Sequence, residues 1–413
     1  MVNSFVKHDH CRLCNDSNVE LVLHLTPTPV ADLYLPENQV IQDPEEFPLD
    51  LYLCNHCGHV QLLHIVNADL LYNDYIYETS NSPGLVNHFK QYSEWTLANV
   101  SVEPHDLAID IGSNDGTLLK FFKEAGLEVL GVDPAQNIAK RASQIGIETL
   151  PVFFTDSIAK GLKLARGPAK IITANNVIAN INDINDFIEG IKSLLAEDGI
   201  FVFETGYLAS LVKNSVFDNV YHEHISYHSV KPLISLFEEH GLKLAQVQTV
   251  DTKGGSLRGI AQHTRERNFI STSVTRFKNQ ESQLGLYHSD TYRSLGNELN
   301  KVKSELLNLL NHFKDEGKTV AGYGASHSVT TLIYHFDLAE HISFLVDDNQ
   351  IKHNTFSPGK LIPVLPPSAI YEQNPDYVLI LPWRFSQLII SNHETYLQNG
   401  GHFVTLLPEV SIV

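Results

Sequence analysis

The sequence is poor in basic residues and in cysteine, and it has no long apolar run. Its 413 residues include 29 Lys and Arg against 48 Asp and Glu, which gives a formal net charge of −19. Nucleic-acid binding needs a basic footprint, so this balance argues against a nucleic-acid partner. No apolar run reaches the roughly 18–20 residues of a membrane helix, and residues 1–10 contain no apolar signal region. We therefore expect a cytoplasmic protein without a membrane partner, and the length predicts two or three domains.

The four cysteines all fall in two Cys-x-x-Cys pairs, Cys11 with Cys14 and Cys54 with Cys57. In a chain without a signal peptide, such pairs are typical of a four-sulfur zinc site rather than of disulfides. Four thiolates complete a tetrahedron with no open position, so the zinc would be structural. A redox dithiol is the alternative. We therefore expect one structural Zn²⁺ in an N-terminal module.

Short apolar runs and glycine turns alternate along much of the chain. Strand, turn and helix patterns repeat from 99 to about 260, which predicts a parallel, doubly wound α/β sheet. A second alternation begins at 319–326, where a strand runs into a glycine turn, and predicts a second, smaller Rossmann-like sheet. The expected organisation is a zinc-binding module at 1–70, a linker with tyrosines and a helix at 71–98, a central Rossmann-like domain at 99–260, a helical connection at 261–313 and a C-terminal Rossmann-like domain at 314–413.

A glycine turn ends the first strand of the central domain. It reads Asp-Ile-Gly-Ser-Asn-Asp-Gly over 110–116, which lacks the Gly-x-Gly-x-x-Gly spacing that holds a pyrophosphate. Asp133 ends the second strand, where a carboxylate can accept both hydroxyls of an adenosine ribose. The combination favours S-adenosylmethionine (SAM) over a dinucleotide, with a helix cap or turn as the alternative role for Asp110 and Asp133. The candidate cofactor-binding residues in these two segments are Asp110, Gly112, Asn114, Asp115, Gly116 and Asp133.

Titrating side chains crowd the segment that follows the strand at 199–205. Tyr221, His222, Glu223 and His224 lie beyond the carboxyl end of that strand, where open α/β sheets place their chemistry. A metal site, an acid–base site and core packing are the three interpretations. Helical metal-binding histidines are spaced by four, whereas His222 and His224 are two apart, which argues against the metal site. The acid–base interpretation is therefore favoured.

Together these motifs resemble the bacterial C-methyltransferases that act on nucleotide-linked 4-keto-6-deoxy sugars, such as the C-3 methyltransferases of dTDP-linked sugars. The resemblance covers essentially the whole chain. It implies a class I methyltransferase fold for the central domain, SAM as methyl donor and a C-terminal domain that contributes to the sugar-nucleotide site. The motifs that carry it are the two cysteine pairs, the turn at 110–116, Gly131-Val132-Asp133-Pro134, Asn175-Asn176-Val177, Tyr221-His222-Glu223-His224, Gly254-Gly255-Ser256-Leu257-Arg258 and Gly322-Tyr323-Gly324-Ala325.

The resemblance also implies roles for individual residues. His224 is expected to be the general base, with Glu223, Tyr221 and Tyr75 as its partners at the substrate. Asn176 is expected at the methyl-transfer centre, and Asn175 beside it at the cofactor. Further substrate contacts are expected from Tyr77, His222, Lys253, Arg258, Tyr323 and His327. Of these, His222 has no firm role.

Three positions depart from the family pattern. Lys253 stands where members often have histidine, and Ser326-His327-Ser328 replaces a lysine–glycine pair. Arg384 stands where asparagine is frequent. All three fall on the expected sugar-nucleotide side, so the sugar and the nucleotide stay open.

Methylation of a carbon sets specific chemical demands. A C–H beside a ketone becomes acidic enough for an enzymic base once the enolate oxygen is stabilised. Histidine, with an unperturbed pKa of about 6.5, suits the base, and a tyrosine hydroxyl or a neutral histidine suits the enolate oxygen. The expected function is therefore SAM-dependent C-methylation of a nucleotide-linked 4-keto deoxy sugar.

Other functions remain as alternatives. O-methylation of a sugar hydroxyl could use the same histidine as base. A dehydrogenase or epimerase is disfavoured because Gly-x-Gly-x-x-Gly is missing. A non-catalytic protein that binds a nucleotide sugar or SAM would leave the dense His/Glu/Tyr segment unexplained. A monomer and a dimer are both open.

Overall fold

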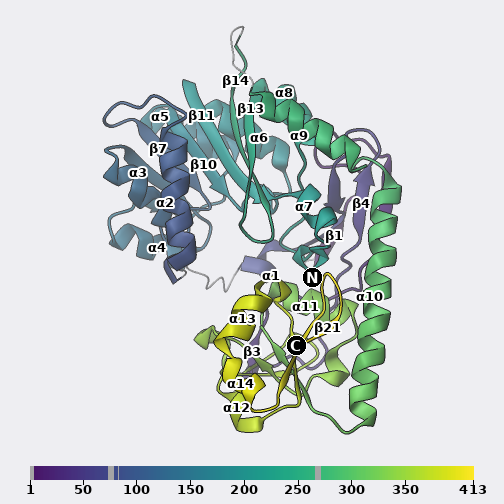
Figure 1. Ribbon diagram of the computed structural model, residues 1–413. Coiled ribbons are helices and arrows are strands. Elements are labelled where there is room, and N and C mark those ends of the chain that lie inside the picture. Colours follow the sequence, from purple (N-terminus) through teal and green to yellow (C-terminus); the bar gives the residue numbers. More distant parts are fainter. Residues whose placement is uncertain (1–3, 73–78, 82, 266–270) are drawn as a thin grey trace.

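The computed structural model describes residues 4–72, 79–81, 83–265 and 271–413. Figure 1 shows the central part of the chain in teal above the C-terminal part in green and yellow, with the long helix α10 running along one side of both. Tyr75 and Tyr77, the two tyrosines expected near the substrate, lie outside the described residues. Among the described residues, no helix is both long and apolar enough to cross a membrane.

The central sheet has seven strands in the order β13-β14-β11-β10-β7-β8-β9. All are parallel except β14, which is antiparallel to both of its neighbours, so the expected all-parallel sheet is wrong at this one strand. Every residue of β7 is buried, as expected for a strand covered on both faces. The strands are β7 (Leu107–Ile111), β8 (Glu128–Val132), β9 (Thr149–Leu150), β10 (Ala169–Asn175), β11 (Leu195–Gly206), β13 (Leu242–Val250) and β14 (Ser256–His263).

Helices follow the strands of this sheet in the alternation that the sequence predicts. Two of them begin at side-chain caps, because Thr155 accepts a hydrogen bond from the Ile158 N–H and Asp183 accepts one from the Asp186 N–H. The helices of the first 250 residues are α1 (Ala68–Tyr72), α2 (Pro83–Leu97), α3 (Thr117–Glu124), α4 (Gln136–Gln144), α5 (Asp156–Arg166), α6 (Ile184–Leu194), α7 (Leu208–Lys213) and α8 (Val230–Glu239), with 3₁₀ turns η1 (Glu37–Gln39), η2 (Thr79–Asn81) and η3 (Phe217–Asn219).

Two helices connect the central sheet to the C-terminal domain. They are α9 (Thr272–Gln283) and α10 (Ser289–Asp315). The apolar residues of α10 recur at three- and four-residue steps, and one stripe of them is buried. This stripe faces the interior, as the recurrence of apolar residues at three- and four-residue steps indicates.

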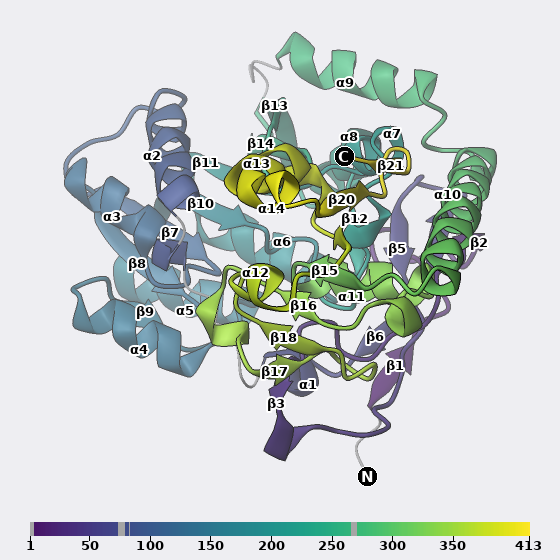
Figure 2. The same ribbon diagram turned by 60° about the horizontal axis from the view of Figure 1, so that its bottom comes forward.

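The C-terminal sheet has eight strands in the order β21-β20-β19-β15-β16-β18-β17-β3. It is therefore not smaller than the central sheet in strand number, because β3 of the N-terminal part pairs with β17 at its edge. The view in Figure 2 brings this sheet forward. Its strands are β3 (Leu35–Pro36), β15 (Val320–Tyr323), β16 (Leu345–Val346), β17 (Thr355–Phe356), β18 (Pro363–Leu365), β19 (Tyr377–Ile380), β20 (His402–Thr405) and β21 (Ser411–Ile412). Its helices and turns are α11 (His327–His335), α12 (Ala369–Gln373), α13 (Ser386–Asn392), α14 (Glu394–Gln398), η4 (Ala339–His341), η5 (Gln350–Lys352) and η6 (Trp383–Phe385).

The N-terminal module contains a hairpin around the second cysteine pair. Strands β4 (Leu51–Cys54) and β5 (Val60–Leu62) pair antiparallel, with β2 (Val19–Leu23) on one side. On the other side lies β12 (Ser226–Tyr227), which follows His224 in the chain. A separate pair joins β1 (Phe5–Lys7) to β6 (His64–Val66). The end of the His/Glu/Tyr segment is therefore part of the N-terminal sheet.

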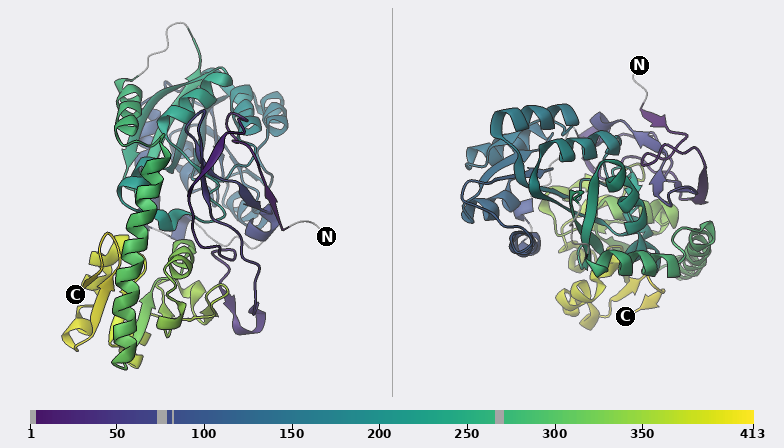
Figure 3. Two further views of the ribbon diagram at one scale, coloured as in Figure 1. Left: turned by 90° about the vertical axis from the view of Figure 1, so that its right-hand side faces the viewer. Right: turned by 90° about the horizontal axis from the view of Figure 1, so that it is seen from above.

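One apolar core connects the N-terminal module, the His/Glu/Tyr segment and the C-terminal domain. It includes buried residues such as Leu53, Phe217, Ile225 and Leu332. Figure 3 shows the purple N-terminal strands beside α10, between the central and C-terminal parts. Residues 217–227, which we call the catalytic loop because the sequence analysis expects the general base His224 there, thus lie where all three parts of the chain meet.

Candidate active site

The four cysteines converge on one point. Their sulfur atoms all lie within 4.8 Å of one another, and they are the only group of three or more potential ligands gathered in this way among the described residues. The Cys11–Cys57 and Cys14–Cys54 sulfur atoms are 3.7 Å apart, and none of the four cysteines is in a disulfide. Zn–S bonds of about 2.3 Å in a tetrahedron place sulfurs about 3.8 Å apart. The spacing therefore fits one four-coordinate zinc with no open position.

The glycine turn after β7 has the close contacts that a ligand-binding turn needs. Gly112 and Gly116 have positive φ angles of 70° and 80°. A Cβ atom at Gly112 would collide with Val177, the residue after Asn176. Only glycine therefore fits at position 112 without displacing Val177, which follows the neighbouring strand β10.

The two aspartates at the strand ends have different environments. Asp110 is buried and accepts a hydrogen bond from the Thr173 hydroxyl at 2.6 Å. Burial, reinforced by the charge of Asp133, raises the pKa of Asp110 to about 7. Asp133 accepts the N–H groups of Asn114 at 2.8 Å and Ala135 at 2.9 Å, so it has the turn-forming role considered above. Each Asp133 oxygen still has a lone pair for another donor, so a second role at the ribose stays compatible with this geometry.

The other residues of the turn hold the chain segment at residues 79 and 80. The Asn114 side-chain oxygen accepts the Thr79 N–H at 3.0 Å, and Asp115 accepts the Ser80 N–H at 2.8 Å. At the end of β10, the buried amide of Asn175 makes no hydrogen bond of good geometry to a described residue. Asn176 adopts a φ of 56° and donates its N–H to the Glu204 carbonyl at 2.7 Å. These contacts place both asparagines at the same edge of the sheet as the glycine turn.

The catalytic loop fixes both nitrogens of His224. Nδ1 lies 3.2 Å from the Asn219 carbonyl oxygen, and Nε2 lies 3.0 Å from the Tyr221 hydroxyl. A carbonyl can only accept, so Nδ1 carries the hydrogen and the Nε2 lone pair accepts the hydroxyl. Burial, followed by the charge of Lys253, lowers the pKa of His224 to about 4. At neutral pH the imidazole is therefore uncharged, and its Nε2 can take a proton.

Glu223 and His222 point to different partners from His224. Glu223 is buried, and its Oε1 lies 3.3 Å from His327 Nε2. Burial would raise the pKa of Glu223, but the charge and hydrogen bond of His327 outweigh it, and the pKa is lowered. His222 is buried against Phe47, and its Nε2 donates to the Phe47 carbonyl at 3.1 Å. The three side chains do not converge as ligands would, and His222 has a packing contact with the N-terminal module.

The remaining substrate candidates separate into two groups. Lys253 is exposed and has a φ of 50°. The positive charges of Lys253 and His327 each act to lower the pKa of His224. Arg258 is instead buried, with its guanidinium 2.8 Å from Glu204 and stacked 4.4 Å from the Tyr92 ring centroid. A buried cation requires a partner, and this one is used within the central domain. The expected substrate contact of Arg258 stays a prediction, and its observed partners lie within the central domain.

Tyr323 belongs to a separate network in the C-terminal domain. Its hydroxyl donates to the Asp348 carboxylate at 3.0 Å and lies 3.2 Å from His393 Nε2. Tyr371 bonds the other nitrogen of His393 at 2.8 Å. Tyr323 is thus engaged within its own domain and is not brought together with His224.

Three family models match successive parts of the chain. They describe a zinc binding domain at residues 11–72, a methyltransferase domain at 88–247 and a C-methyltransferase C-terminal domain at 251–408. The chain is also 33% identical to the C-methyltransferase NovU of Streptomyces niveus, over 98% of this chain and 97% of that protein. The chain belongs to the bacterial C-methyltransferase family. It is a SAM-dependent C-methyltransferase, so the expected family, fold class and enzyme class are confirmed.

Solved structures show weaker likenesses to this C-methyltransferase. Magnesium protoporphyrin IX methyltransferase (ChlM) from Synechocystis PCC 6803 matches with a TM-score of 0.34 and 14% identity, over 44% of this chain and 80% of that one. The CcbJ methyltransferase from Streptomyces caelestis matches with a TM-score of 0.35 and 12% identity, over 47% of this chain and 95% of that one. Both scores are too low to carry an argument.

Several residues around the catalytic loop of this C-methyltransferase have no signal in the sequence that would single them out. Arg384 was noted only as a departure, yet its Nη1 donates to both oxygens of the buried Asp218 at 2.8 and 2.9 Å. Arg12, between the first two cysteines, is buried and donates to the carbonyls of Ile225 and Leu62, the latter at 2.8 Å. Both arginines hold the loop from another domain. Only the fold, which joins residues far apart in the chain, reveals them.

Proposed function

We propose that this C-methyltransferase acts on a nucleotide-linked 4-keto deoxy sugar and that His224 is its general base. The observation that carries the proposal is the state of His224. Its imidazole is neutral, its Nδ1 hydrogen is held by the Asn219 carbonyl, and its Nε2 lone pair accepts the Tyr221 hydroxyl. The side chain is partly exposed, so a substrate can reach it.

The proposed reaction begins with removal of a proton from the carbon beside the ketone. His224 Nε2 takes the proton, and the C–H electron pair moves into the enolate, whose negative charge rests on the ketone oxygen. The Lys253 ammonium and the Tyr221 hydroxyl are the groups proposed to stabilise that oxygen, with Tyr221 turning its one hydrogen from Nε2 to the substrate. SAM, when bound, supplies the methyl group to the enolate carbon.

The cofactor and zinc assignments are part of the same proposal. Asp133 would accept the ribose hydroxyls of SAM, and Asn175, whose buried amide has no well-formed hydrogen bond to a described residue, would face the cofactor. The other candidate residues would shape the turn that holds SAM and would not recognise SAM alone. They are Asp110, Gly112, Asn114, Asp115 and Gly116. One zinc would occupy the four-cysteine cluster. The C-terminal domain would contribute to the sugar-nucleotide site through the turn that ends at His327.

Solvent exchange tests the proposed chemistry directly. A dTDP-linked 4-keto-6-deoxy sugar, incubated in D₂O with the enzyme and S-adenosylhomocysteine (SAH) but without SAM, should take up deuterium at a carbon next to the ketone. The reason is that enolate formation does not require the methyl donor. NMR of the recovered sugar measures this uptake. Methylation of a hydroxyl without any exchange would instead support the O-methyltransferase alternative.

The proposed ribose contact predicts a loss of cofactor affinity in Asp133→Asn. The substitution removes the charge of a carboxylate that would receive hydrogen bonds, and bonds to charged groups contribute about 1.5–3 kcal/mol. SAH affinity, measured by calorimetry, should fall roughly 10- to 100-fold. Glu128→Gln is the matched control, because Glu128 lies at the opposite end of the same strand and is exposed. Equal affinities for the two variants would remove Asp133 from the site.

A further inference from the structure

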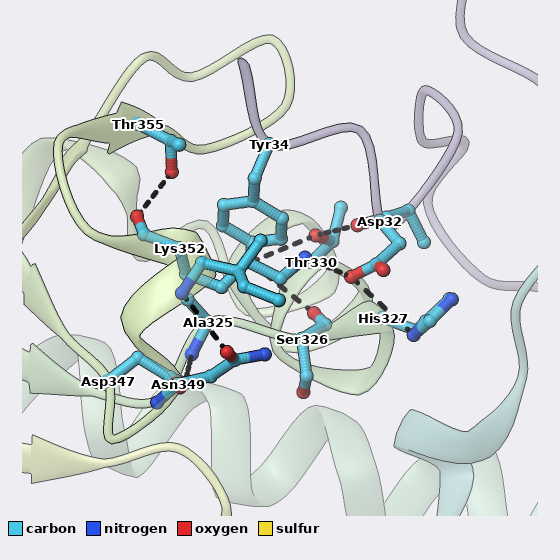
Figure 4. A network of polar contacts seen from close by, with 12 residues as sticks. Asp32, Tyr34, Ala325, Ser326, His327, Thr330, Asp347, Asn349, Lys352 and Thr355 are labelled. Atoms are coloured by element: carbon cyan, nitrogen blue, oxygen red, sulfur yellow. Dashed lines mark hydrogen bonds and ion pairs between the residues drawn. The ribbon is translucent and has the colours of Figure 1, made fainter. Parts of the chain in front are cut away.

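His327 lies between two carboxylates from two other parts of the chain. Its Nε2 is 3.3 Å from Glu223 Oε1 in the catalytic loop, and its Nδ1 is 3.6 Å from Asp32 Oδ1 in the N-terminal module. Figure 4 shows His327 and Asp32 facing each other at the start of α11. A neutral imidazole has only one N–H, so it can serve only one of these carboxylates. The imidazolium form can serve both.

The surrounding charges also depend on a protonated His327. Lys352 Nζ lies 2.6 Å from the same Asp32 oxygen and 4.3 Å from the centre of the Tyr34 ring. Two carboxylates thus face two cations in this network, provided that His327 is charged. Without that charge, no other cation among the described residues pairs with the buried Glu223, because Lys352 pairs with Asp32, and an unpaired buried carboxylate is unfavourable.

The network reaches the base through one aromatic ring. Tyr221 packs between His327, at a ring-centroid distance of 5.0 Å, and His224, at 4.1 Å. The Tyr221 hydroxyl bonds His224 Nε2. A shift of His327 or Glu223 would therefore displace the residue that lies directly against the base.

We propose that His327, as an imidazolium, is a positioning residue that links the N-terminal module to the catalytic loop and keeps Tyr221 against His224. The proposal rests on the proposed function of His224. It differs from the sequence-based expectation that His327 contacts the substrate, because both of its nitrogens already face protein carboxylates. His327 has no direct contact with the reacting atoms in this role.

The direction of the pH dependence follows from the charges that face His327. Burial lowers the pKa of His327, but Glu223 and Asp32 outweigh burial, so the pKa is raised above 6.5 despite the opposing charge of Lys352. A raised pKa means that the bridge is fully formed below about pH 6.5 and is lost as the pH rises through the pKa of folded His327. The base His224 titrates near pH 4, so its limb of the profile lies on the acid side. The His327 bridge therefore contributes an alkaline limb to the pH profile of kcat.

The first measurement does not use activity. In the SAH-bound enzyme, the Cε1–H signal of His327 in an NMR titration should report a pKa above 6.5. Asp32→Asn should lower that pKa, because it removes one of the two facing charges. A His327 signal that titrates below 6.5, or that does not respond to Asp32→Asn, overturns the bridge whatever the substrate proves to be.

The second measurement separates positioning from substrate contact. We expect His327→Gln to lower kcat about 10- to 100-fold on a dTDP-linked 4-keto-6-deoxy sugar with little change in KM, because small displacements of catalytic groups cost that much. His327→Lys should restore much of kcat and lack the alkaline limb attributed to His327, because lysine keeps its charge. His312→Gln, the same substitution at an exposed position of α10, serves as the control. A raised KM with normal kcat, or an unchanged alkaline limb in His327→Lys, would overturn the proposal. If the wild type shows no exchange in D₂O, the role of His224 fails while the NMR result still stands.

Discussion

His224→Gln should lose roughly 10²- to 10⁴-fold in kcat, the range that general-base catalysis contributes. Glutamine keeps an N–H that can reach the Asn219 carbonyl, but its amide has no lone pair basic enough to remove a proton from carbon. SAH affinity should stay at the wild-type value, because His224 lies in the catalytic loop and not in the glycine turn. Steady-state kinetics and calorimetry measure these two quantities on the same preparation.

The exchange reaction sharpens this test. Deuterium uptake into the keto sugar should fall as steeply as methyl transfer in His224→Gln, because both need the same proton to be removed. His312→Gln is the control, since His312 is exposed on α10. If His224→Gln exchanged deuterium at the wild-type rate, another group would be the base. Lys253 would then be the next candidate, because its charge acts on the same site.

The sequence could predict the local features of this enzyme, but not the partners that long-range pairing brings to each residue. The four-cysteine cluster, the glycine turn and most of the alternating α/β pattern follow from spacing and residue type. Arg258 is different. Its motif suggested substrate contact, but β14 runs antiparallel to β11 and places Arg258 directly opposite Glu204. That register brings a cation and a carboxylate together inside the domain, and no local pattern indicates it.

The same limit applies to the catalytic loop. The sequence supplied His224, Glu223 and Tyr221 as candidates, but not the protonation state of His224. That state depends on the Asn219 carbonyl, which is set by the fold of the loop. The assignment of Glu223 depends on His327, which comes from a different domain. Candidate chemistry was therefore predictable, whereas the partner of each group required the three-dimensional arrangement.

Removal of zinc should abolish methyl transfer even though the four cysteines lie outside the catalytic loop. Structural zinc contributes about 10–16 kcal/mol to the folding of zinc-finger peptides at pH 7, so the knuckles should not persist without it. Arg12 lies between two of the ligands and donates to the carbonyl of Ile225, the residue after His224. The strand β12, which follows, pairs with β5 beside the second knuckle. Loss of the metal should therefore release the end of the catalytic loop.

The measurement is a titration with a chelator, in which zinc content, melting temperature and kcat are followed together. We expect kcat to fall in proportion to zinc content and the melting temperature to fall by roughly 10 °C, as expected for a loss of several kcal/mol in a domain of this size. Purified enzyme with well below one zinc per chain and full activity would contradict the four-thiolate site.

Arg12→Met separates the metal from the contact that it supports. Methionine fills much of the buried space of the arginine stem but cannot donate to Ile225 or Leu62. The four thiols are unchanged, so the zinc content should remain at one per chain, whereas kcat should fall because the loop that contains His224 loses its anchor. If Arg12→Met keeps both zinc and full kcat, the zinc module stabilises the fold without positioning the base. If it keeps zinc and loses kcat, the module also acts on catalysis, through the backbone next to His224.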